Sequence, residues 1–110
     1  MSRTIGALDG RLVPYARNLV SAALRLSRRA VVTSTLRTRA EQTRLFKAAS
    51  RSKYPAARPG TSLHERGLAF DIGGLTVSQL RRLGRLWESW GGRWGGRFRD
   101  PIHFEAGIRK

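Results

Sequence analysis

The chain has no cysteine, seven acidic residues and only two histidines among its 110 residues. The absence of cysteine excludes a disulfide framework and a zinc site built on thiolates. Every apolar run is far shorter than the roughly 20 residues of a membrane-spanning helix, so we expect no span. The opening residues 1–6 lack the apolar stretch of a secretory signal. Stability must come from apolar side-chain burial, helped by a metal ion if one binds.

Charge of one sign is in large excess. The chain has 22 basic residues, 19 of them arginine, and a formal net charge of +15. Such a charge attracts polyanions, of which nucleic acid is the usual one. However, the arginines are scattered, and the aromatic residues do not alternate with basic ones as base-stacking surfaces require. We therefore expect no nucleic-acid partner, and either a solvated basic surface or one that holds the protein to an anionic bacterial envelope.

The length of the chain suits one domain, residues 1–110, with a modest core and no room for a second module. Apolar periodicity and turn residues predict helices over about 10–28, 39–49 and 77–90 and strands over about 30–34, 68–72 and 102–105. Helices interleaved with short strands predict an α+β fold, in which helices pack on a small, largely antiparallel sheet.

Capping residues mark where these helices begin. Asp9 is the expected cap of the first helix, while Thr38 with Glu41 and Thr76 with Gln79 have the capping-box spacing. The residues expected to face inward in the second and third helices are Leu45, Phe46, Leu80, Leu83, Trp87 and Trp90. The tryptophans are therefore interpreted as core and hairpin residues rather than as a sugar-stacking surface.

Both histidines lie in short polar clusters, residues 62–71 and 100–105, which also contain Asp71, Asp100 and Glu105. Two imidazoles and one carboxylate can hold Zn²⁺ with a fourth position left open for water, as in catalytic zinc sites. The clusters therefore predict a metal-dependent reaction.

Strand geometry supports one zinc site. Alternation along the last strand places His103 and Glu105 on the same face. Gly67 permits a tight turn that returns His64 toward Asp71. The predicted ligands are His64, Asp71 and His103, at about 2.0–2.2 Å from the ion.

The clusters form an ordered pattern, Ser62-x-His64-x-x-Gly67-x-Ala69-x-Asp71 followed by Asp100-x-x-His103-Phe104-Glu105. This pattern resembles the zinc peptidases of peptidoglycan, which include D-alanyl-D-alanine carboxypeptidases, L-alanyl-D-glutamate endopeptidases and several phage endolysins, and whose fold the hedgehog signalling domain shares. The resemblance spans roughly residues 8–107, with further matching segments at 34–38, 41–42, 57–61 and 90–92. It implies one zinc ion and a peptidoglycan stem peptide as substrate.

The resemblance also implies roles for four polar residues. Asp100 would be the general base and later the acid that protonates the leaving amine. Aspartate at this position matches the endopeptidase branch, whereas the dipeptidase branch has glutamate. Arg37 would hold a substrate carboxylate or the developing oxyanion. Ser62 would hydrogen-bond the peptide or cap the turn, and Glu105 would orient a ligating imidazole or pair with an arginine.

The predicted function is a zinc-dependent peptidoglycan hydrolase, by preference an L-alanyl-D-glutamate endopeptidase of endolysin type. Cleavage of D-alanyl-D-alanine is the alternative bond. Two other classes stay open: a non-catalytic zinc-containing wall-binding domain, and a nucleic-acid-binding protein driven by its charge. We expect a monomer that is made in the host cytoplasm and reaches the cell wall after release, during phage lysis, or as part of a virion.

Overall fold

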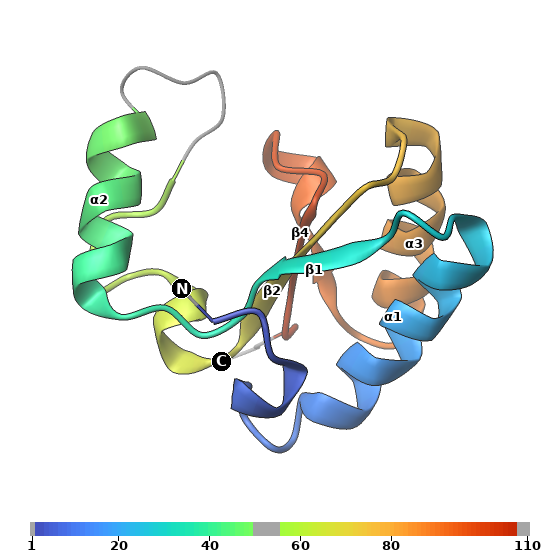
Figure 1. The fold of residues 1–110 in the computed structure, drawn as a ribbon, viewed down its shortest axis with the longest axis horizontal. Coiled ribbons are helices and arrows are strands. Elements are labelled where there is room, and N and C mark those ends of the chain that lie inside the picture. The colour runs from blue at the N-terminus through green and yellow to red at the C-terminus, as the bar shows by residue number, and fades with distance from the viewer. Residues whose placement is uncertain (1, 50–55, 108–110) are drawn as a thin grey trace.

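The computed structural model describes residues 2–49 and 56–107. Its helices, 3₁₀ turns and strands follow one another as η1 (Ile5–Ala7), α1 (Val13–Leu26), β1 (Val31–Ser34), α2 (Arg39–Ala49), η2 (Leu63–Arg66), β2 (Ala69–Gly73), α3 (Val77–Ser89), β3 (Arg93–Trp94), η3 (Gly95–Phe98) and β4 (His103–Glu105) (Figure 1). The predicted α+β class is confirmed. None of the helices in the described ranges is long and apolar enough to cross a membrane.

The four strands form one antiparallel sheet in the order β1-β2-β4-β3. β2 is central, with Asp71 directly opposite His103 of β4. On its other side, Asp71 is opposite Ser34, after an irregularity in β1 between Val32 and Ser34. The middle of the sheet thus brings together side chains that lie far apart in the sequence.

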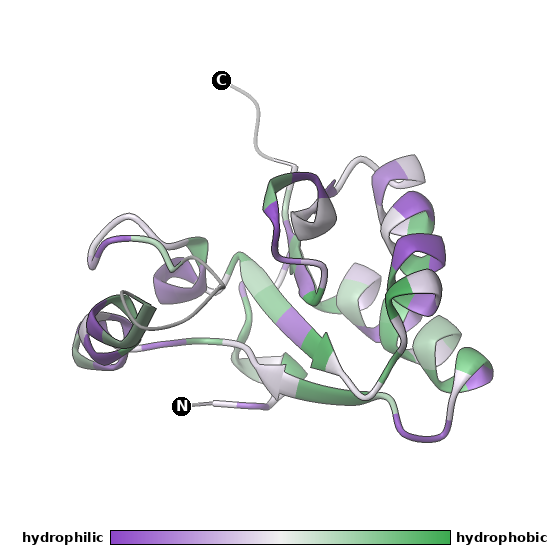
Figure 2. Ribbon diagram, turned by 90° about the horizontal axis from the view of Figure 1, so that it is seen from above, coloured by the Kyte–Doolittle hydropathy of each residue, from purple (hydrophilic) through white to green (hydrophobic). Residues whose placement is uncertain are grey.

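Helices α1 and α3 cover one face of the sheet, and α2 lies at the opposite end of the molecule (Figures 1 and 2). The core between these helices and the sheet contains Ala16, Leu19, Phe70, Ile72, Leu83, Trp87 and Phe104. Because side chains alternate along a strand, burial of Phe70, Ile72 and Phe104 leaves Asp71 and His103 on the other face. The apolar pattern of β2 and β4 therefore fixes which face carries the polar groups.

The first helix is shorter than expected, and Asp9 does not cap it. The helix begins at Val13, and its N-cap is Leu12, which makes no side-chain cap bond. The Asp9 carboxylate instead accepts a hydrogen bond from the backbone N–H of Arg11 and forms an ion pair with its guanidinium. The Asp9 main-chain carbonyl accepts hydrogen bonds from Leu12 and Val13 in the turn before the helix. The Asp9 carboxylate is bound by Arg11 and does not cap the helix.

Both predicted capping boxes are present, at Thr38 with Glu41 and at Thr76 with Gln79. Two inward-facing predictions are wrong. Phe46 is exposed, because α2 stands away from the core and buries only Gln42. Trp90 lies past the end of α3 as its C-cap and is 38% exposed. The expected loop at residues 50–63 falls partly outside the described residues.

Candidate metal centre

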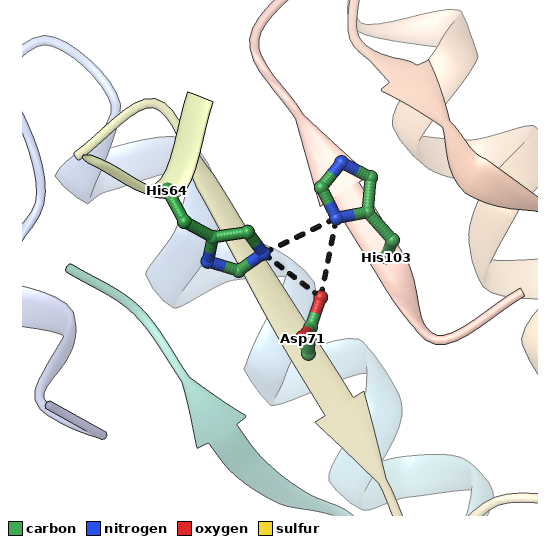
Figure 3. A group of neighbouring side chains, drawn as sticks. All are labelled: His64, Asp71 and His103. Carbon is green, nitrogen blue, oxygen red and sulfur yellow. Dashed lines mark hydrogen bonds and ion pairs between the residues drawn. The ribbon is translucent and has the colours of Figure 1, made fainter. Parts of the chain in front are cut away.

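The structure brings the three predicted ligands together on the polar face of the sheet (Figure 3). His64 Nε2, His103 Nδ1 and Asp71 Oδ1 form a triangle in which each pair of atoms is 3.2 Å apart. In a tetrahedral site with bonds of about 2.1 Å, ligand atoms lie about 3.4 Å from one another. All three side chains are buried. The spacing and chemistry of this set therefore fit one zinc ion.

Local structure explains how the ligands meet. The β2–β4 register places Asp71 and His103 opposite each other, and the single turn of η2 presents His64 beside them. That turn ends at Gly67, which has a φ of 69°. A Cβ at Gly67 would lie 2.9 Å from the backbone nitrogen of Asp9, so a side chain is excluded by space as well as by conformation. The predicted tight turn before β2 is confirmed.

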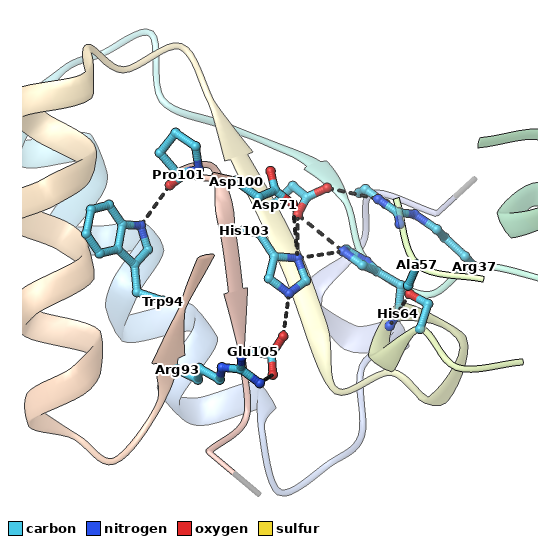
Figure 4. A network of polar contacts seen from close by, with 12 residues as sticks. Arg37, Ala57, His64, Asp71, Arg93, Trp94, Asp100, Pro101, His103 and Glu105 are labelled. Carbon is cyan, nitrogen blue, oxygen red and sulfur yellow. Dashed lines mark hydrogen bonds and ion pairs between the residues drawn. The ribbon is translucent and has the colours of Figure 1, made fainter. Parts of the chain in front are cut away.

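Each imidazole has its second nitrogen engaged, which decides the nitrogen that faces the triangle. Figure 4 shows the contact of His103 with Glu105. His64 Nδ1 donates to the Thr35 carbonyl oxygen at 2.8 Å, so Nε2 presents its lone pair to the site. His103 Nε2 donates to Glu105 Oε1 at 2.7 Å, so Nδ1 does the same. Metal-binding histidines in proteins are commonly oriented in this way by a carbonyl or a carboxylate. The triangle is thus oriented for a cation.

Asp71 is held by Arg37. Arg37 Nη2 donates to Asp71 Oδ2 at 2.9 Å, which leaves Oδ1 for the triangle. The same guanidinium donates to Ser34 Oγ at 3.0 Å and to Gln42 Oε1 at 3.1 Å. A guanidinium has five N–H donors, so two remain for a ligand in the adjoining cleft. The predicted contact of Arg37 with substrate stays a prediction, and the structure adds its contact with Asp71.

The cluster is strongly coupled electrostatically. Burial alone would raise the pKa of Asp71, but hydrogen bonds from His103 and His64 hold that pKa well below its usual range. Burial alone would lower the pKa of His103, but hydrogen bonds with Asp71 and Glu105 outweigh it and raise the pKa to about 9. In the absence of a cation, His103 is therefore protonated near neutral pH. A divalent ion must displace that proton.

Asp100 lies next to the triangle, with Oδ2 at 4.0 Å from His103 Nδ1. Burial and the negative charge of Asp71 raise the pKa of Asp100. A carboxylate with a raised pKa beside a metal site is suited to accept a proton and return it. Asp100 thus lies beside the predicted ligands, and its role as the general base remains a prediction.

The triangle opens into a cleft of about 1060 Å³. One side of the cleft is formed by α2 and the segment after it, the other by the turn at residues 91–93. Arg37, Ser62 and Asp100 lie along it with the three ligands. The cleft therefore extends to both sides of the triangle.

Ser62 and Glu105 take part in contacts that the sequence left as alternatives. Ser62 Oγ accepts a hydrogen bond from the backbone N–H of His64 at 3.2 Å, so it caps η2. Its contact with a peptide stays a prediction. Glu105 both orients His103 and lies 3.7 Å from Arg93 Nη1.

Sequence reasoning assigned no role to Thr35, Ser34 or Gln42. The Thr35 contact uses a main-chain oxygen, so the type of side chain at position 35 does not indicate it. Gln42 is fully buried and links Arg37 to the Ala57 carbonyl, to which its amide donates at 2.8 Å. The sequence contains one signal for Gln42. It is a polar residue on the buried side of α2, a helix that has few apolar residues.

Comparisons with known proteins identify the family of the chain. The sequence model of the family described as VanY, D-alanyl-D-alanine carboxypeptidase, matches residues 6–94. No curated protein matches the chain by sequence.

Several solved structures share the fold. A mutant of the vancomycin resistance D,D-pentapeptidase VanY from the VanB-type resistance cassette, in complex with Zn(II), has a TM-score of 0.72 at 22% identity, covering 92% of this chain and 73% of that one. VanYB in complex with D-alanine-D-alanine has a TM-score of 0.69 at 24% identity, covering 92% and 72%. The L-Ala D-Glu endopeptidase ChiX of Serratia marcescens has a TM-score of 0.59 at 23% identity, covering 93% and 82%.

The predicted kinship with the zinc peptidases of peptidoglycan is therefore confirmed. One structural neighbour is solved with Zn(II), and this chain has a His/Asp/His set that could hold such an ion. The family match extends over most of the sequence, and the chain belongs to the VanY family of D-alanyl-D-alanine carboxypeptidases.

Proposed function

We propose that the protein hydrolyses an amide bond in the stem peptide of peptidoglycan, with the terminal D-alanyl-D-alanine bond as its first target. One observation carries the proposal: the triangle of His64, Asp71 and His103 opens into a cleft beside Asp100. Membership of the VanY family supports the choice of bond.

The zinc ligands, Asp100 and Arg37 have separate roles in the proposed reaction. Zinc, when bound by His64, Asp71 and His103, supplies Lewis-acid activation of water and polarises the scissile carbonyl. Asp100 accepts the proton of the attacking water and later gives it to the leaving amine. The two remaining N–H groups of Arg37 hold the substrate carboxylate or the developing negative charge. Both roles are compatible with the placement of these side chains in the cleft.

The L-alanyl-D-glutamate bond, which the sequence favours, is the second candidate. It is supported by aspartate rather than glutamate at position 100 and by the likeness to ChiX. Cleavage of this bond fits an enzyme that acts on the cell wall after release from the host cytoplasm, as an endolysin does.

Digestion of purified muropeptides by zinc-loaded protein, with product masses as the readout, tests the proposal. Loss of a single terminal alanine identifies carboxypeptidase activity, and release of the peptide after its first alanine identifies the endopeptidase. Chelation must stop the reaction and zinc must restore it. Asp100→Ala should abolish turnover, whereas Asp9→Ala, the same change of a carboxylate outside the cleft, should not.

Two results would count against this reading. Full activity of Asp100→Ala would exclude the proposed general base. A zinc-loaded protein that cleaves neither bond but binds purified sacculi would favour the non-catalytic wall-binding domain.

A further inference from the structure

One end of the molecule is built from the last turn of α1, the loop after it, the start of β1 and the first turn of α3. Val31 of β1 pairs with Gly73 of β2. A Cβ on Gly74 would overlap the carbonyl oxygen of Arg29. The Gln79 amide of α3 donates to the Leu26 carbonyl at 3.2 Å. These contacts join the segments into one surface, at the end of the molecule away from α2 (Figure 1). We call it the helical tip: Leu24, Arg25, Arg28, Arg29, Val31, Val77 and Arg81.

Three aliphatic side chains of the helical tip face solvent. Leu24 is 48% exposed, Val31 50% and Val77 59%. Single exposed aliphatic residues are ordinary on protein surfaces. Here they come from three elements that the fold brings to the same end of the molecule.

The rest of the helical tip is cationic. Arg25, Arg28, Arg29 and Arg81 are all exposed. Neither the segment 10–40 nor the segment 72–87 contains an acidic residue. The only acidic residue of α3, Glu88, is at the other end of that helix and pairs with Arg97. The positive charge of the helical tip is therefore not neutralised by its own elements.

We propose that the helical tip binds an anionic phospholipid surface, with its guanidinium groups on lipid phosphates and its aliphatic side chains in the interface. Guanidinium groups form paired hydrogen bonds with phosphate oxygens, and exposed aliphatic groups gain free energy by entering the headgroup boundary. A hydrated polyanion such as nucleic acid would use the arginines alone and gain nothing from Leu24, Val31 and Val77. The combination of both features selects a lipid surface.

Docking through the helical tip leaves the cleft open, because none of its residues lines the cleft. The protein would then be held beside the membrane while the triangle of ligands faces away from the lipid contact. This inference is independent of the bond that the enzyme cleaves, so failure of either proposal leaves the other standing.

The test is co-sedimentation with phosphatidylglycerol-containing vesicles and with pure phosphatidylcholine vesicles. The variant Arg25→Gln, Arg28→Gln, Arg29→Gln, Arg81→Gln should bind the anionic vesicles about 100-fold more weakly or worse. The control Arg3→Gln, Arg17→Gln, Arg44→Gln, Arg58→Gln removes the same charge from exposed positions elsewhere and should lose much less. The double variant Leu24→Ser, Val77→Ser keeps the full charge and should bind about 10-fold more weakly.

Three outcomes would overturn the proposal. The unaltered protein fails to bind anionic vesicles. The control loses as much affinity as the helical-tip variant, so that charge acts without regard to place. The Leu24→Ser, Val77→Ser variant binds vesicles as the parent does, in which case a duplex DNA arm of the same experiment asks whether a hydrated polyanion is the partner. Thermal unfolding of each variant confirms that it is folded.

Discussion

At the scale of single residues, every predicted ligand of the metal centre is held by a second group. Thr35 fixes His64, Arg37 fixes Asp71, and Glu105 fixes His103. Each of these contacts decides which atom faces the ion. The donor atoms are therefore placed before the metal arrives, which lowers the ordering cost of binding it.

The contact of Glu105 with His103 gives a direct test of this arrangement. Glu105→Ala removes the acceptor that orients the His103 imidazole, so zinc affinity should fall about 10- to 100-fold. Competition with a fluorescent chelator measures the change. Arg93→Gln is the matched control, because Arg93 lies 3.7 Å from the same carboxylate, its side chain is 64% exposed and exposed ion pairs contribute little. Equal affinity of Glu105→Ala and the parent would remove Glu105 from the metal centre.

The pKa of His103 predicts how pH acts on the zinc-free and zinc-loaded forms. Its folded pKa of about 9 exceeds the ordinary 6.5, so its contribution to zinc-free stability is present below about 6.5 and is lost as pH rises through about 9. Zinc must displace this proton, so zinc affinity should instead rise about tenfold per pH unit below that pKa. Urea unfolding of the chelated protein and zinc titrations, both across this range, check the two opposite slopes. Zinc affinity that does not change with pH would show that His103 is unprotonated before binding.

At the scale of elements, α3 depends on a close approach to β3. Gly84 lies against the Trp94 ring, and a Cβ there would overlap ring atoms. The ring cannot give way easily, because its Nε1 donates to the Pro101 carbonyl at 2.8 Å. Gly84 thus sets the distance between α3 and the segment that leads to His103.

Gly84→Ala should therefore destabilise the protein. Alanine would improve helix propensity by about 1 kcal/mol, but overlap with a fixed ring costs about 1–3 kcal/mol, and we expect net destabilisation. Gly10→Ala adds the same methyl group where nothing lies within 4 Å and should leave stability nearly unchanged. Midpoints of urea unfolding compare the two. A Gly84→Ala protein as stable as the parent would show that Trp94 can move.

Elements whose signals are local were predicted from sequence. The bounds of α2 agree, and the alternation that puts His103 beside Glu105 on one face of β4 holds. Predictions failed where the outcome depends on a distant partner. Periodicity placed Phe46 and Trp90 on apolar faces but says nothing about whether another element covers them. The prediction that Asp9 caps the first helix was wrong, because the Asp9 carboxylate is bound by Arg11.

The candidate site was also predicted only in part: its proposed metal ligands were identified, but several of the groups that position them were not. The residues that meet at the triangle were selected from the sequence, because few residue types ligate zinc and few copies of them are present. The groups behind them were not. The Thr35 carbonyl contacts His64 from 29 residues away, and the residue types alone do not indicate the local contacts of Ser34 and Gln42 with Arg37. A chain with two histidines and seven acidic residues offers few candidates for metal ligands, but many residues could contact those ligands.

At the scale of the whole molecule, the metal centre joins three segments of the second half of the chain, the outermost of which lie 39 residues apart. His64 precedes β2, Asp71 lies within it, and His103 begins β4. An ion that binds all three stabilises the folded state only, because the unfolded chain does not hold them together.

Zinc should therefore raise the melting temperature. At a free concentration of about 100 times the dissociation constant it adds about 2.7 kcal/mol, which is on the order of 10 °C for a chain of this size. Calorimetry with and without chelator measures the shift, and His64→Ala should show almost none. A parent protein that melts at the same temperature in chelator would contain no stabilising ion.

The register between β2 and β4 limits how this sequence can change in length. Sliding β4 by one residue would turn His103 and Glu105 into the core and bring Phe104 beside Asp71. Sliding it by two would keep the faces but carry His103 about 7 Å along the strand, beyond the reach of a metal bond. Insertions and deletions between the two strands must therefore be absorbed by the connections around α3 without altering the pairing. A longer relative can have additional residues in those connections, whereas the number of residues in each of the two strands must stay the same.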